Sequence, residues 1–125
     1  MVSKKILIVD DDPDVREVTQ LCLEVSRDWQ IITACSGQEG IQTAIYEQPD
    51  LILLDVMMPE LDGLDTWKKL KQHPKTQQIP VIFLTARVQA QEKQCYQDLG
   101  IEVVLAKPFD PLFLADAIAK ALQWQ

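Results

Sequence analysis

Acidic residues follow two short aliphatic runs of this sequence, at the points where the runs end. Asp10, Asp11 and Asp12 come directly after residues 6–9, and Asp55 comes directly after residues 51–54. Such runs are typical of strands that are buried on both faces of a parallel sheet. Carboxylates that crowd together repel one another, and a hard divalent cation such as Mg²⁺ relieves that repulsion. The acids therefore predict a Mg²⁺ site, provided that the fold brings the two strand ends together.

Two further polar side chains stand at the ends of later predicted strands. Thr85 closes the strand of residues 81–85, and Lys107 directly follows the strand of residues 102–106. Carboxylates, a hydroxyl and an ammonium group around one site suit phosphoryl transfer, in which positioning and charge neutralisation dominate the chemistry. Taken singly, each residue has a structural explanation, such as a helix cap for an acid or a solvated surface position for the lysine. Their joint occurrence at successive strand ends favours the functional interpretation.

The elements that must position these residues alternate regularly between strand and helix. Strands are predicted over residues 6–9, 29–34, 51–54, 81–85 and 102–106. Five strand–helix alternations predict one α/β domain over residues 1–125, with a doubly wound parallel sheet between two layers of helices. In the strand order 2-1-3-4-5, the order reverses between the first and third strands, where open α/β sheets bind ligands. Asp10, Asp11 and Asp55 belong to these two strand ends.

Capping residues and apolar spacing mark the helices. The first helix is predicted to begin at Pro13, with Asp12 as its N-cap. Ser36 and Glu39 form a capping-box pattern at the start of the second helix. The later helices are predicted over residues 64–72, from 88 to 99, and after a cap at Asp110. The apolar stripe of the first helix is predicted to consist of Val15, Val18, Leu21, Cys22 and Val25.

The composition excludes several classes of function. A chain of 125 residues with 47% hydrophobic and 25% charged residues fits one globular domain. Its net charge of -7 opposes direct binding to nucleic acid or to an anionic membrane surface. Since no long apolar segment follows a basic start, we expect a cytoplasmic protein. The odd number of cysteines, Cys22, Cys35 and Cys95, and their wide spacing favour reduced thiols over disulfides or a zinc site.

Four motifs of the sequence are ILIVDDD at 6–12, LILLDVMMPELDG at 51–63, PVIFLTA at 80–86 and LAKPF at 105–109. Together they resemble the receiver domain of bacterial response regulators, the CheY-like module of two-component systems. The resemblance covers the whole chain, and the spacing of Asp55, Thr85 and Lys107 suits the family. It implies a flavodoxin-like fold and a signalling switch that catalyses only its own phosphorylation and dephosphorylation.

The resemblance also implies roles for individual residues. Asp55 would be the phosphoacceptor, taking the phosphoryl group of a phosphohistidine on a histidine kinase or phosphotransfer protein. Asp11 and Asp55 would bind Mg²⁺ directly, the backbone carbonyl of Met57 would be a further ligand, and Asp10 would act mainly through a metal-bound water. By the same resemblance, Lys107 would pair with a phosphoryl oxygen, and the Thr85 hydroxyl would bond another.

One position departs from the family pattern. Many members carry an aromatic residue three positions before the lysine, where this chain has Val104. A downstream protein is expected on the surface of the fourth helix, fifth strand and last helix, but the usual aromatic switch for that surface is absent or altered. From the net charge we expect no direct contact with nucleic acid or membrane, and we expect a monomer or weak dimer.

Two other protein classes with related folds require residues at positions where this sequence has different ones. A flavodoxin-like cofactor carrier needs a glycine- and hydroxyl-rich phosphate loop after the first strand, where this chain has three acids. A haloacid-dehalogenase-type phosphatase has its nucleophile after the first strand, whereas the best nucleophile here, Asp55, follows the third. The remaining alternative is a receiver module excised from a larger regulator or hybrid kinase.

Overall fold

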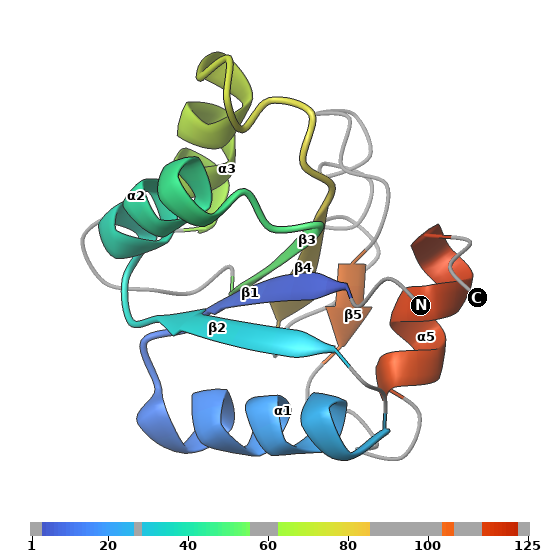
Figure 1. The fold of residues 1–125 in the computed structure, drawn as a ribbon. Helices are drawn as coiled ribbons and strands as arrows, with labels where there is room; N and C mark the ends of the chain where they lie inside the picture. The colour runs from blue at the N-terminus through green and yellow to red at the C-terminus, as the bar shows by residue number, and fades with distance from the viewer. Residues whose placement is uncertain (1–3, 27–28, 56–62, 86–103, 107–113, 123–125) are drawn as a thin grey trace.

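Five parallel strands form a single sheet in the computed structural model, which describes residues 4–26, 29–55, 63–85, 104–106 and 114–122. The strand order is β2-β1-β3-β4-β5, as predicted from the sequence (Figure 1). The strands are β1 (Lys5–Val9), β2 (Gln30–Ala34), β3 (Leu51–Asp55), β4 (Val81–Thr85) and β5 (Val104–Ala106).

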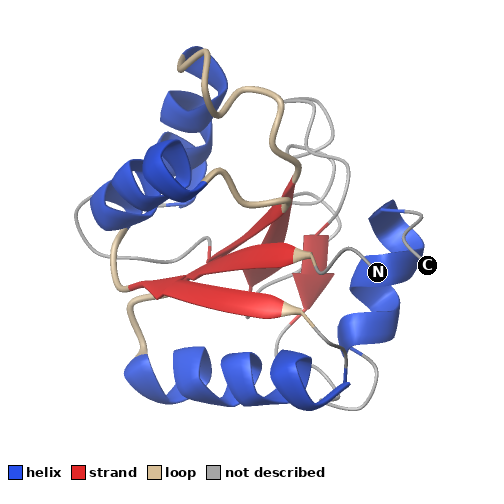
Figure 2. Cartoon of the chain, viewed as in Figure 1, coloured by secondary structure: helices blue, strands red, loops and turns tan. Residues whose placement is uncertain are grey.

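Helices cover both faces of this sheet. The described helices are α1 (Pro13–Ser26), α2 (Gly37–Glu47), α3 (Gly63–Gln72) and α5 (Leu114–Leu122). One layer contains α1 and α5 and the other contains α2 and α3, with the sheet between them (Figure 2). This arrangement confirms the predicted doubly wound α/β fold. The predicted helix from residue 88 to residue 99 and the predicted cap at Asp110 lie outside the described residues. None of the helices described is long and apolar enough to span a bilayer.

Alternate side chains of each central strand enter opposite halves of the core. In β1, Leu7 and Val9 pack on the α2 and α3 side, whereas Ile6 and Ile8 pack on the α1 and α5 side. Side chains of a strand alternate in this way, so a strand covered on both faces needs apolar residues at every position. The uninterrupted aliphatic runs of the sequence have this structural cause.

The helix starts follow the predicted caps. The Asp12 carboxylate accepts hydrogen bonds from the backbone N–H groups of Asp14 at 3.0 Å and Val15 at 3.4 Å, and α1 begins at Pro13. The Ser36 hydroxyl accepts from the backbone N–H of Glu39 at 3.1 Å. Each cap satisfies a backbone donor that has no partner within the helix.

The predicted apolar stripe of α1 is wrong for three of its members. Val18, Leu21 and Val25 are 48%, 53% and 85% exposed, whereas Thr19 and Leu23 are fully buried. The helix therefore packs on the sheet with a neighbouring face. Val15 and Cys22, the other two members of the predicted stripe, are half-buried.

A buried threonine explains why the spacing of apolar residues indicated the wrong face. The Thr19 hydroxyl donates to the backbone carbonyl of Val15 at 2.7 Å, so its polar atom has a partner within the helix and its methyl group can enter the core. A polar residue can therefore occupy the packed face. Apolar residues lie on two adjacent faces of α1, and only the tertiary contacts decide between them.

Gly40 of α2 lies so close to β1 that a larger residue would collide with it. A Cβ atom at this position would come within 2.7 Å of Val9 Cγ2 and 3.1 Å of Val9 Cγ1. Val9 is buried and β-branched, so its side chain has little freedom to move. We expect Gly40→Ala to lower the free energy of unfolding by about 1 kcal/mol, because overpacking outweighs the gain of about 1 kcal/mol in helix propensity.

The same substitution in a Val9→Ala background separates the two contributions. Without the Val9 methyl groups the collision is gone, so Gly40→Ala should there raise the free energy of unfolding. Urea unfolding of the parent, both single variants and the double variant measures this change of sign. A stabilising effect of Gly40→Ala in the parent background would contradict the close packing of α2 on β1.

Candidate functional site

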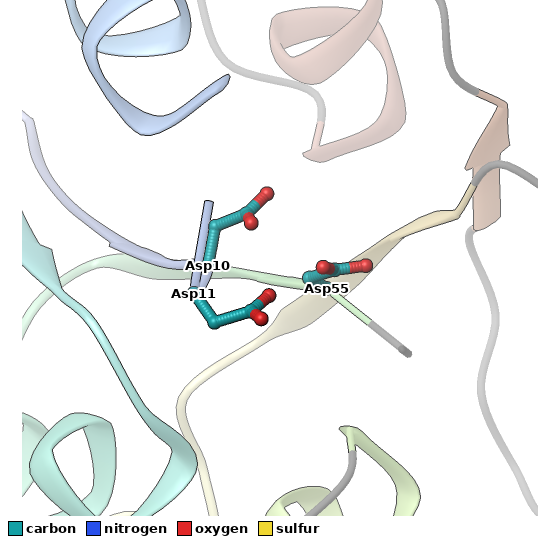
Figure 3. Close-up of side chains that lie close together, drawn as sticks. All are labelled: Asp10, Asp11 and Asp55. Atoms are coloured by element: carbon teal, nitrogen blue, oxygen red, sulfur yellow. The ribbon is translucent and has the colours of Figure 1, made fainter. Parts of the chain in front are cut away.

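Three carboxylates converge at the carboxyl ends of β1 and β3. One oxygen from each of Asp10, Asp11 and Asp55 lies within 4.8 Å of the others, and Figure 3 shows the three side chains at this edge of the sheet. Asp10 and Asp55 are buried, at 2% and 7% exposure, and Asp11 is exposed. We call these three residues the acid cluster. The predicted convergence of the two strand ends is confirmed.

Strand pairing brings the members of the acid cluster together. β1 and β3 are neighbours in parallel register, with Val9 opposite Leu54, so the residues that follow each strand lie at the same edge. The backbone N–H of Asp10 donates to the carbonyl of Ala34 in β2 at 3.2 Å, which continues the sheet contact by one residue. The position of these acids therefore follows from the strand order.

Among the remaining predicted site residues, the structure describes the backbone of Thr85. Thr85 is the last residue of β4, where it pairs with Ala106 of β5, so its backbone lies at the same edge of the sheet as Asp55. Met57 and Lys107 lie outside the described residues. Their predicted roles remain predictions.

The donors of the acid cluster fit Mg²⁺. Carboxylate oxygens are hard ligands, and Mg²⁺ usually combines one or two of them with several waters and with phosphate oxygens. The exposed side chain of Asp11 leaves solvent access to the cluster, which those waters require. Two buried carboxylates and one exposed carboxylate also form a concentration of like charge that a divalent cation relieves.

Cysteine chemistry is not favoured beside this site. Cys35 directly follows β2, and its Sγ donates a hydrogen bond to Glu39 Oε2 at 3.0 Å. This hydrogen bond and the negative charge of Glu39 raise the pKa of the Cys35 thiol. A raised pKa leaves less thiolate, the nucleophilic form, at neutral pH. Cys22 and Cys35 are free, as predicted, and Cys95 lies outside the described residues.

Sequence reasoning missed one residue that contacts the acid cluster. Arg16 of α1 donates from Nη1 to the backbone carbonyl of Asp10 at 2.7 Å. Its position in the first turns of a helix that begins beside the acids was the available signal, because helical side chains point back toward the helix N-terminus. The sequence alone does not show that the side chain reaches the main chain of β1.

Comparisons with known proteins identify the family of this chain. The sequence model of the response regulator receiver domain family matches residues 6–119. The alkaline phosphatase synthesis transcriptional regulatory protein PhoP of Bacillus subtilis is 40% identical over 110 residues, which are 88% of this chain and 45% of that protein. This chain spans about half the length of PhoP and of other transcriptional regulators that it matches.

Solved structures give the same result. A response regulator from Chloroflexus aurantiacus is 34% identical, with a TM-score of 0.87 over 98% of this chain and 99% of that chain. The chemotaxis protein CheY4 of Vibrio cholerae is 28% identical, with a TM-score of 0.83 over 98% of each chain. The family match over most of the chain, the shared fold and the acid cluster lead to one conclusion. The chain belongs to the family of response regulator receiver domains.

Proposed function

We propose that this chain accepts a phosphoryl group on Asp55 in the presence of Mg²⁺ and signals through protein contacts that depend on that modification. The observation that carries the proposal is the convergence of Asp10, Asp11 and Asp55 within 4.8 Å, at the ends of β1 and β3 where the strand order reverses. Asp55 ends β3, so its main chain is fixed by pairing with β4. Membership of the receiver family supports the same assignment.

The reaction is the transfer of a phosphoryl group from a donor to Asp55, the acceptor. A carboxylate oxygen of Asp55 forms a bond to phosphorus while the bond from phosphorus to the donor breaks. The donor nitrogen of a phosphohistidine leaves with that electron pair, and Asp55 becomes an acyl phosphate. Positioning of the carboxylate and neutralisation of charge account for most of the catalysis in such transfers.

The acid cluster and the main-chain oxygen of Met57 would hold the cation. Bound there, Mg²⁺ supplies positive charge against the oxygens of the incoming phosphoryl group. Thr85 and Lys107 would bond the phosphoryl oxygens, the first through its hydroxyl and the second through its ammonium group. Asp10 and Asp11 would orient the cation, and Asp55 would keep one carboxylate oxygen for the reaction with phosphorus.

Partners follow from this reaction. A histidine kinase or phosphotransfer protein would supply the phosphoryl group, and a downstream protein would recognise the modified chain. The exposed apolar side chains of Val18, Leu21 and Val25 lie on α1, the helix that begins beside the acid cluster, and they offer a donor protein apolar surface to cover. Downstream contact is proposed for the surface of the 88–99 segment, β5 and α5.

A receiver within a longer regulator is the second form of this proposal. The observation that favours it is that the chain matches about half the length of several transcriptional regulators. The chemistry at Asp55 is the same in both forms. The partner that reads the phosphorylated surface would then be another domain of the same protein.

Acetyl phosphate tests the chemistry without a partner protein. Incubation of the chain with acetyl phosphate and Mg²⁺ should add the mass of one phosphoryl group, seen by intact mass spectrometry. Chelation of the cation with EDTA should prevent the addition, and hydroxylamine, which cleaves acyl phosphates, should remove it. Absence of any mass gain at saturating acetyl phosphate and Mg²⁺ would refute the proposal.

Mg²⁺ should also stabilise the folded chain, because it binds the assembled acid cluster and not the dispersed acids of the unfolded chain. At a concentration ten times its Kd, it should raise the free energy of unfolding by about 1.4 kcal/mol. Urea unfolding in MgCl₂ and in NaCl of equal ionic strength measures the difference. The NaCl series removes the contribution of general charge screening.

Asp11→Asn is the matched variant for this measurement. Asp11 is exposed, so the change removes one charge without leaving a cavity. The variant should lose most of the Mg²⁺ effect, and in EDTA it should be at least as stable as the parent, because one like charge has gone. An equal Mg²⁺ effect in the parent and in Asp11→Asn would place the cation elsewhere.

A further inference from the structure

The cationic side chain of Arg16 contacts the main chain of the acid cluster. It lies in α1, it is half-buried, and its Nη1 donates to the carbonyl oxygen of Asp10 at 2.7 Å. A guanidinium donor makes this a short, charge-assisted hydrogen bond, stronger than one between neutral groups. The contact joins α1 to the point where β1 ends.

Three different parts of Asp10 are fixed by three different segments. Its N–H donates to Ala34 of β2 at 3.2 Å, its Oδ1 accepts from the N–H of Asp12 at 3.0 Å, and its carbonyl oxygen accepts from Arg16. The carbonyl belongs to the peptide that joins Asp10 to Asp11. The bond from Arg16 therefore restrains the peptide that carries two of the three carboxylates of the acid cluster.

We infer that Arg16 is a positioning residue for the divalent-cation site. By holding the peptide between Asp10 and Asp11, it keeps both carboxylates directed toward Asp55 before the cation arrives. The inference rests on the proposed Mg²⁺ site. Arg16 itself is a cation, so it acts through the acids and not as a ligand.

A purely electrostatic role of Arg16 predicts the opposite result. Its positive charge repels a divalent cation, so removal of the charge alone would strengthen Mg²⁺ binding. Arg16→Lys keeps the charge but replaces the planar, branched donor by a shorter point charge. Arg16→Met removes the charge and the donor while it keeps an unbranched apolar stem.

The test is a titration of the ¹⁵N-labelled chain with MgCl₂ at constant ionic strength, followed through its amide NMR signals. Arg16→Met and Arg16→Lys should each weaken Mg²⁺ binding about three- to tenfold, the range expected when one supporting hydrogen bond is lost. In Mg²⁺-free solution, the amide signals of Asp11 and Asp12 should already shift in both variants. Phosphorylation by acetyl phosphate should need proportionally more Mg²⁺ and approach the parent rate at saturation.

Lys5→Met is the matched control for loss of a cation. Lys5 Nζ likewise donates to a backbone carbonyl, that of Glu47 at 3.3 Å, and also pairs with the Glu47 carboxylate at 3.2 Å. Lys5 begins β1, so this contact is at the other end of the strand from the acid cluster. The control variant should bind Mg²⁺ with the affinity of the parent, whatever its stability.

The outcomes separate this inference from the proposed function. If the parent binds Mg²⁺ but both Arg16 variants bind it as tightly or more tightly, the positioning role is wrong and the metal site stands. If the parent does not bind Mg²⁺, the metal site and the positioning role fall together. Should Arg16→Met not fold, the comparison of Arg16→Lys with the parent still decides the question, since lysine preserves the charge.

Discussion

Asp55→Asn should abolish phosphorylation by acetyl phosphate while the chain stays folded. The amide matches the carboxylate in size, so the substitution fits the buried end of β3, but an amide oxygen is a poor nucleophile toward phosphorus. Intact mass spectrometry after incubation with acetyl phosphate and Mg²⁺ should show one added phosphoryl group on the parent and none on the variant. Far-UV circular dichroism and urea unfolding confirm that the variant is folded.

Asp65→Asn is the matched control for the same change of charge. Asp65 is an exposed acid in the first turn of α3, outside the acid cluster. The control variant should be phosphorylated at the rate of the parent. If Asp55→Asn gained the same mass as the parent, another residue would be the acceptor and the assignment of Asp55 would be wrong.

The strand ends and the edge of the sheet at which the acids lie were predictable because they depend on buried strands, whereas the strand order came from a known order of doubly wound sheets. Residues 6–9 and 51–54 are aliphatic throughout, since helices cover both faces of β1 and β3. A run of this kind marks where a strand ends, and the first residue after it lies at the carboxyl edge of the sheet. The neighbouring positions of β1 and β3 then bring Asp10, Asp11 and Asp55 together.

Details within the acid cluster were not predictable in the same way. Asp10 is 2% exposed while the adjacent Asp11 is exposed, and this difference depends on how the chain turns from β1 into α1. The anchoring bond from Arg16 depends on where α1 sits against the sheet. Neither the turn nor the helix placement has a period or a motif in the sequence, because both are set by tertiary packing.

The face of α1 is the case in which the apolar pattern was misleading. Its apolar residues follow helical spacing on two adjacent faces, and the buried face includes a threonine whose hydroxyl bonds within the helix. The periodicity of apolar residues does not take account of a polar residue whose hydrogen-bonding group finds a partner within its own helix, and such a residue can be buried. The stability of three variants in this helix distinguishes the two faces.

Leu23→Ala should lower the free energy of unfolding by about 2–5 kcal/mol, because Leu23 is fully buried among the side chains between α1 and the sheet. Its neighbours in that half of the core include Ile6 and Ile8 of β1. These two side chains cannot fill the space that the leucine side chain leaves unless β1 moves, so a cavity remains. Urea unfolding followed by far-UV circular dichroism gives the free energy of each variant.

Leu21→Ala and Val25→Ala are the controls from the exposed face of the same helix. Leu21 is 53% exposed and Val25 is 85% exposed, so truncation removes little buried surface, and alanine has the higher helix propensity at both positions. Each should change the free energy of unfolding by less than about 1 kcal/mol. If Leu21→Ala lowered the free energy of unfolding as much as Leu23→Ala, the face that the apolar spacing indicated would be the one packed on the sheet. The small loss expected at Leu21 instead leaves this face of α1 free to contact a partner, because its side chains contribute little to the fold.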